Sequence, residues 1–155
     1  MLIDFITPAE ATASFKTFLV GGGIAVMVPM VILSLTPPKP GRPALSFGTR
    51  CVMALFFFAC VGWVGYSWTL GRFVAAEVSA AGVTLRYTGP FGKDVVLGAR
   101  QVKDVRFGMD NKRDTWCYIV FERDDSKTYK SAWLEQPSRE CKRIRDEILG
   151  ELKPG

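Results

Sequence analysis

Residues 87–94 read YTGPFGKD, a stretch in which two glycines bracket a Pro-Phe pair and a lysine follows the second glycine. Glycine-rich loops that end in Gly-Lys hold nucleotide phosphates in P-loop proteins, but they place four residues before the Gly-Lys pair and a Ser or Thr after it. Here only two residues separate Gly89 from Gly92, and an acidic residue, Asp94, follows Lys93. The stretch therefore predicts a turn between two strands, with Phe91 as an apolar ring at its tip.

The chain of 155 residues contains no histidine. This removes the commonest general base, the commonest metal ligand and the usual partner of a serine or cysteine nucleophile. Ser131 and Cys117, as isolated nucleophiles, therefore lack a base. The aspartates at 110, 114, 124 and 125 fall in predicted turns, where Asp commonly bonds to the backbone, and their spacing does not match a calcium-binding loop. We predict a chain that is not an enzyme and that has no metal, cofactor or small-molecule substrate.

Four cysteines are present, and no two have the C-x-x-C spacing of zinc or redox sites. Cys51 and Cys60 lie in an apolar segment, where cysteine behaves as a small packing residue. We interpret Cys117 and Cys141 in the same way, as reduced residues. A bridge between Cys117 and Cys141 is the alternative.

Basic and acidic residues are interspersed, giving a net charge of +5 without a concentrated basic stripe. This pattern argues against nucleic-acid binding and suits a solvated surface beside an anionic membrane. The best candidates for a contact surface are Phe91 and a cluster at one hairpin end, formed by Lys112, Arg113 and Trp116. The hypothesis is that these residues touch lipid headgroups or a partner subunit. The alternative is that Trp116 is a core residue and the two basic side chains are solvated.

Two segments carry no charged residue, 17–38 and 51–71. Each is long enough to cross a hydrocarbon core of about 30 Å as a helix, and both are apolar on all sides, unlike a soluble helix. We therefore divide the chain into an N-terminal segment (1–16), a transmembrane hairpin (17–71) with connector 37–50, and a tail (72–155).

Small residues in the first span allow close approach of a second helix. They are Gly21, Gly22 and Gly23. Two readings are open, a contact within the hairpin and a contact with another membrane protein. In the second span, Tyr66 and Trp68 are typical of an aromatic belt at the membrane–water interface.

The short connector places both termini on the same side of the membrane. Basic residues are almost evenly divided between the two sides, so the positive-inside rule does not decide the orientation. Cysteines interpreted as reduced favour a cytoplasmic tail. We expect an integral protein of a bacterial inner or intracytoplasmic membrane.

The tail changes to period-two patterning, with apolar residues two apart. In residues 116–123, WCYIVFER, both faces are apolar, which predicts a central strand. Residues 138–152 predict an amphipathic helix, because Cys141, Ile144, Ile148, Leu149 and Leu152 share one stripe. Further strands are predicted at 73–79, 83–88, 94–98, 102–108 and 127–134. The fold class is α+β, a transmembrane helical hairpin followed by a small antiparallel β barrel or sandwich closed by a C-terminal amphipathic helix.

This layout resembles a bacterial pleckstrin-homology-like domain attached to a two-span hairpin. The resemblance rests on AAGVTLRY as strand–Gly–strand, on GPFGKDVVLGARQVKDVRF as the next hairpin and strand, and on the terminal helix. The layout is also similar to two-span photosystem assembly factors. Eukaryotic phosphoinositide binders carry a dense basic cluster in the first hairpin, whereas this chain has only Arg86 and Lys93 there.

The resemblance implies a non-enzymatic scaffold, assembly factor or accessory subunit of a larger membrane complex, with the tail as a protein-binding module. The expected partners are other integral membrane proteins and the lipid bilayer. The alternative is a membrane-anchored module that binds lipid headgroups.

Overall fold

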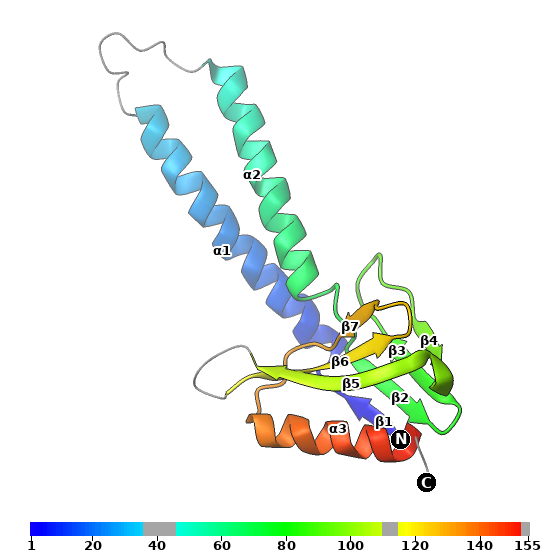
Figure 1. Ribbon diagram of the computed structural model, residues 1–155. Helices are drawn as coiled ribbons and strands as arrows, with labels where there is room; N and C mark the ends of the chain where they lie inside the picture. Colours follow the sequence, from blue (N-terminus) through cyan, green and yellow to red (C-terminus); the bar gives the residue numbers. More distant parts are fainter. Residues whose placement is uncertain (36–45, 110–114, 153–155) are drawn as a thin grey trace.

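A computed structural model describes residues 1–35, 46–109 and 115–152. Two long helices stand side by side above a β domain, and a third helix lies under that domain (Figure 1). The order along the chain is one short strand, the two helices, six further strands and the last helix. The expected α+β class, with two long apolar helices followed by antiparallel sheets, is confirmed.

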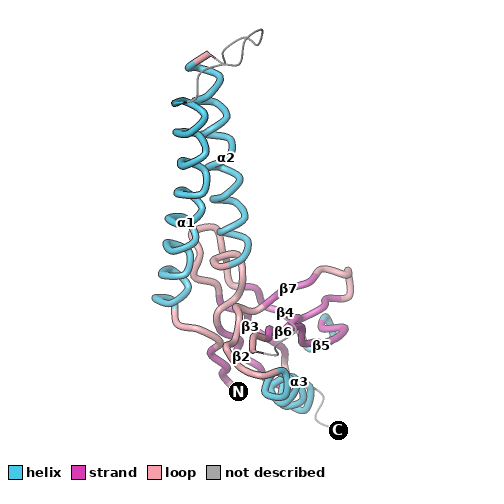
Figure 2. Tube along the Cα trace, turned by 90° about the vertical axis from the view of Figure 1, so that its left-hand side faces the viewer, coloured by secondary structure: helices cyan, strands magenta, loops and turns pink. Residues whose placement is uncertain are grey.

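The hairpin consists of α1 (Pro8–Leu35) and α2 (Phe47–Trp68). Both helices are long and apolar enough to cross a membrane, and their side chains are largely unburied by the rest of the protein. A second view, turned by 90°, shows that both helices extend together from the β domain (Figure 2). At a rise of 1.5 Å per residue, α1 is about 42 Å long and α2 about 33 Å long.

The first helix begins well before the uncharged segment, because a capping box starts it. In the sequence TPAE, the Thr7 hydroxyl accepts a hydrogen bond from the Glu10 backbone N–H at 3.2 Å, and the Glu10 carboxylate accepts one from the Thr7 N–H at 2.8 Å. This reciprocal pairing satisfies donors that a helix start leaves open. Pro8, at the first helical position, has no donor to lose.

The first sheet has four antiparallel strands in the order β1-β2-β3-β4. They are β1 (Leu2–Asp4), β2 (Ala75–Ser79), β3 (Gly82–Arg86) and β4 (Val95–Gly98). The strand β1 was not expected from the sequence, which set residues 1–16 apart as a separate segment. It pairs with β2 in the register Leu2 to Glu77 and Asp4 to Ala75, so the β domain contains chain from both sides of the hairpin.

The second sheet has three antiparallel strands in the order β5-β6-β7. They are β5 (Val102–Met109), β6 (Cys117–Arg123) and β7 (Thr128–Lys130). The expectation that residues 116–123 form a central strand is confirmed. Cys117, Ile119 and Phe121 are fully buried, whereas Tyr118 and Val120 are half-buried on the other face.

The described strands do not close into a barrel, which corrects one of the two sequence alternatives. After the short strand β4, the chain turns through the 3-10 helix η1 (Ala99–Gln101) and starts a new sheet instead of continuing the first ladder. The sheets meet at a parallel bridge between Phe73 and Ser131, where the Ala132 N–H donates to the Phe73 carbonyl at 2.8 Å.

The helix predicted at the C-terminus is α3 (Ser138–Leu152), which packs on strands of both sheets. Its buried residues are Cys141, Ile148 and Leu152, and Ile144 and Leu149 pack beside them, as the stripe predicts. The helix therefore covers the core that lies between the sheets. The largest fully buried side chains of that core are Phe73, Phe121, Leu85, Leu97, Ile119 and Ile148.

Cys117 and Cys141 form a disulfide, so their interpretation as reduced residues is wrong. The cause is geometric: the buried face of β6 and the buried stripe of α3 point at each other, which brings the two Cα atoms to 6.2 Å, within the range that a bridge needs. Cys51 and Cys60 are free. The expectation of a cytoplasmic tail rested on reduced cysteines and is therefore no longer supported by them.

Reduction of this bridge should destabilise the β domain by about 3 kcal/mol, because the bridge closes a loop of 24 residues and restricts the unfolded chain. The measurement is denaturant unfolding of the detergent-solubilised protein with and without reductant. Thiol titration in denaturant should find two thiols before reduction and four after it. A value of four without reductant would contradict the bridge. Replacement of Cys51 and Cys60 by alanine is the control and should leave the effect of reductant unchanged.

Candidate interaction site at the base of the hairpin

The two helices are fixed to the β domain where α1 begins and α2 ends. The Phe5 N–H donates to the Val74 carbonyl at 2.8 Å, and the Phe5 ring meets the Phe73 ring edge-on at 5.3 Å. Ala11 of α1 is fully buried in a small apolar cluster with Leu70 and Val74. The helix bases and the adjoining surface of the domain therefore form one continuous junction.

The Phe91 turn is part of this junction. Gly89 lies so close to the segment after α2 that a Cβ placed on it would come to 2.7 Å from the Leu70 carbonyl oxygen. The Gly92 N–H closes the turn by donating to the Gly89 carbonyl at 3.0 Å. The Phe91 ring contacts Tyr66 edge-on at 5.7 Å yet remains 81% exposed. The turn thus holds an apolar ring in solvent-accessible space beside the end of α2.

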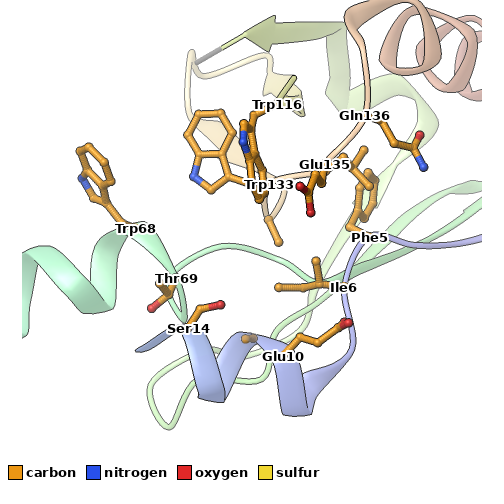
Figure 3. Close-up of a pocket in the computed structure, with 13 residues that line it drawn as sticks. Phe5, Ile6, Glu10, Ser14, Trp68, Thr69, Trp116, Trp133, Glu135 and Gln136 are labelled. Carbon is orange, nitrogen blue, oxygen red and sulfur yellow. The ribbon is translucent and has the colours of Figure 1, made fainter. Parts of the chain in front are cut away.

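Trp116 lies on another side of the junction, at the rim of a cavity of about 480 Å³. Its side chain is 37% exposed, so it is not a fully buried core residue. The walls come from the start of α1, the end of α2 and the segment after β7 (Figure 3). The polar and aromatic lining residues include Glu10, Trp68, Trp116, Trp133, Glu135 and Gln136.

A more basic hollow of about 320 Å³ borders the same end of α2. Arg72 and Lys130 line it, and Arg72 also stacks over Trp133, with its guanidinium carbon 4.4 Å from the ring centroid. Tyr87 lies in the same wall, where burial, with the nearby Tyr129 and Tyr66, raises its pKa to about 12. Tyr87 is therefore a neutral phenol at physiological pH.

The other sequence candidates are placed as follows. Lys112 and Arg113 lie outside the described residues. Gly22 faces the second helix, since a Cβ on it would collide with Val61, and a Cβ on Gly23 would be 3.4 Å from Phe58. Gly21 faces outward, with nothing within 4 Å of such a Cβ. Gly22 therefore contacts the second helix of the hairpin, whereas Gly21 has open space around it, and its contact with another membrane protein stays a prediction.

Ser131, considered above as an isolated nucleophile, has a structural role. It is fully buried, and its hydroxyl accepts a hydrogen bond from the Ile119 N–H at 2.9 Å and donates to the Ala132 carbonyl at 2.7 Å. Within the described ranges, no three His, Cys, Asp or Glu side chains lie close enough together to hold a metal ion.

Sequence reasoning missed the cavity residues Glu10, Trp133 and Glu135. The TPAE capping box was a readable signal for Glu10, because it predicts a helix start at Thr7 and puts Glu10 in the first turn, at the junction. Trp133 and Glu135 follow the last strand without a regular pattern, and only the fold brings them to the helix bases. Neither the protein-family models nor the curated proteins compared with this chain include a match.

Replacement of Gly22 by valine should separate the two helices, because the new side chain would occupy the position of Val61. Such overpacking costs about 1–3 kcal/mol. Gly21→Val is the matched control, since the space around it is open. The measurement is thermal unfolding of the full chain in detergent, in which only Gly22→Val should lower the transition temperature. Equal transition temperatures for the two variants would contradict this helix contact.

Proposed function

We propose that the chain is an integral membrane protein that acts as a non-enzymatic scaffold, assembly factor or accessory subunit of a larger membrane complex, with the β domain as its protein-binding module. Two apolar helices of sufficient length support the insertion into a bilayer. Their outward-facing surface, which includes the open position of Gly21, is available to lipid or to neighbouring helices.

The exposed Phe91 ring is the observation that carries this proposal. An apolar ring at 81% exposure adds little to the stability of the fold, yet close-packed glycines and a ring contact hold it in one place. Ordered aromatic side chains that are exposed in the free protein commonly anchor interfaces. Its position beside the end of α2 would bring it against a membrane partner near the bilayer surface.

The same position favours one alternative, a module that binds lipid headgroups. Arg72 and Lys130 line the hollow next to the end of α2, where cations would meet lipid phosphates. The two functions differ in what lies against Phe91, a protein or the bilayer itself.

We also propose that the β domain faces the oxidising side of the membrane, opposite to the cytoplasmic placement that reduced cysteines favoured. The support is the Cys117–Cys141 disulfide, since such bonds persist outside the reducing cytoplasm. The connector, with Lys39, Arg42 and Arg50, would then lie in the cytoplasm, a placement that the nearly even division of basic residues neither favours nor opposes.

Replacement of Phe91 by the photo-crosslinking residue benzoylphenylalanine should give one discrete protein adduct on irradiation of native membranes. The same replacement at Val96, an exposed apolar residue of β4 at 73% exposure, is the matched control and should give none. The readout is an immunoblot followed by identification of the crosslinked protein. Crosslinks to lipid alone would favour the alternative function, and identical adducts from both positions would contradict a specific surface.

The orientation can be measured with one added cysteine in the exposed turn between β6 and β7, in a chain whose free Cys51 and Cys60 are replaced by alanine. Asp124→Cys should react with a membrane-impermeant maleimide in right-side-out vesicles, because Asp124 is exposed and the domain would face outward. Inverted vesicles should react only after permeabilisation. Labelling in inverted vesicles alone would place the domain in the cytoplasm. The parent chain, without the new cysteine, is the control.

A further inference from the structure

We propose that the cavity between the hairpin and the β domain binds the ammonium group of a zwitterionic phospholipid. The cavity of about 480 Å³ is large enough for a headgroup and opens beside Trp68, the last residue of α2. This site goes beyond the proposed function: it requires that the hairpin is in the membrane, and it does not require a protein partner.

The location of the cavity places it at headgroup depth. Its walls include the first turns of α1, through Glu10 and Ser14, and the end of α2, through Trp68 and Thr69. A bilayer that surrounds the two helices must therefore end near this opening, because charged residues return to the chain here. Figure 3 shows Trp68 at the end of α2, apart from Trp116 and Trp133 on the β domain.

The chemistry of the walls suits a cation. Among the described residues that line the cavity, Glu10 and Glu135 are acidic and none is basic. Three of the lining residues are tryptophans, whose ring faces attract ammonium groups more strongly than those of other aromatic residues. Carboxylates combined with indole rings form a recognised type of site for alkylammonium ligands.

The two acidic residues have different roles. Glu10 is committed to the capping box, where one carboxylate oxygen accepts from both the Thr7 N–H and the Thr7 hydroxyl, so it contributes mainly charge. Glu135 lies on the surface after β7, and its carboxylate is drawn beside Trp133 (Figure 3). We therefore expect Glu135 to make the direct contact with the ammonium group.

Arg72 shows that one ring of the cavity already contacts a cation, and its charge limits which ligand can bind beside it. Its guanidinium already stacks on Trp133 at 4.4 Å, outside the cavity lining, so this ring attracts cations in the folded protein. A second cation near Arg72 needs a carboxylate to balance the repulsion, which Glu135 provides. A lipid with a net negative headgroup would instead meet Glu10 and Glu135 unfavourably.

The test uses the purified full chain in a neutral detergent, with native mass spectrometry to count retained lipids. The probes are dioleoyl phosphatidylethanolamine, phosphatidylcholine and phosphatidylglycerol, added one at a time at equal concentration. At least one of the two zwitterionic lipids should be retained more than phosphatidylglycerol. If phosphatidylethanolamine is retained best, hydrogen bonding to Glu135 contributes most to binding of the ammonium group. If phosphatidylcholine is retained best, the tryptophan rings contribute most.

Glu135→Gln and Trp116→Ala should each weaken zwitterionic retention at least about fivefold. The matched controls are Glu151→Gln on α3 and Trp63→Ala within α2, both outside the cavity lining. Thermal unfolding checks that Glu135→Gln, a change at an exposed residue, leaves the fold intact. Equal retention of all three lipids would overturn the proposal. Unchanged retention by the two variants would overturn it as well.

Discussion

The pairing of β1 with β2 is the constraint on which the arrangement of the molecule depends. Three residues before the hairpin, Leu2–Asp4, complete a sheet whose other strands all follow the hairpin. Phe5 then enters the same core as Phe73. Both ends of the helical pair are therefore held by one hydrophobic core, and the junction becomes a shaped surface instead of a flexible tether.

This continuous junction explains why polar and aromatic groups from several parts of the chain gather at one place. The end of α2 lies between two hollows of opposite charge. One is the cavity lined by carboxylates, and the other is lined by Arg72 and Lys130. Trp68 borders both. Such a separation of charge resembles that of a zwitterionic bilayer surface, in which ammonium and phosphate groups alternate. It also leaves the Phe91 turn as an apolar projection between the helix end and the domain.

Much of the local structure could be predicted from the sequence, because period and composition directly encode it. The uncharged runs became α1 and α2, the two apolar faces of residues 116–123 became a central strand, and the stripe from Cys141 to Leu152 became the buried face of α3. The errors arose where distant segments meet. The strand β1 has no local signal that shows its partner, since three residues define a strand only by what they pair with. The sequence named Cys117–Cys141 as a possible bridge, but only the fold shows that the two residues face each other. The tryptophans of the cavity come from three separate parts of the chain, the end of α2, the segment before β6 and the segment after β7, for the same reason.

The discontinuous β domain has a consequence for how the protein is made. During synthesis β1 leaves the ribosome before both helices, whereas its partner β2 follows them, because Leu2 pairs with Glu77 across the entire hairpin. If the hairpin crosses a bilayer as proposed, the sheet can be completed only when the start of α1 and the end of α2 lie on the same side. A chain with one helix inserted would keep β1 and β2 apart, leave Phe73 without Phe5 and expose an unpaired strand edge. In the membrane protein proposed above, folding of the β domain would therefore depend on the insertion of both helices.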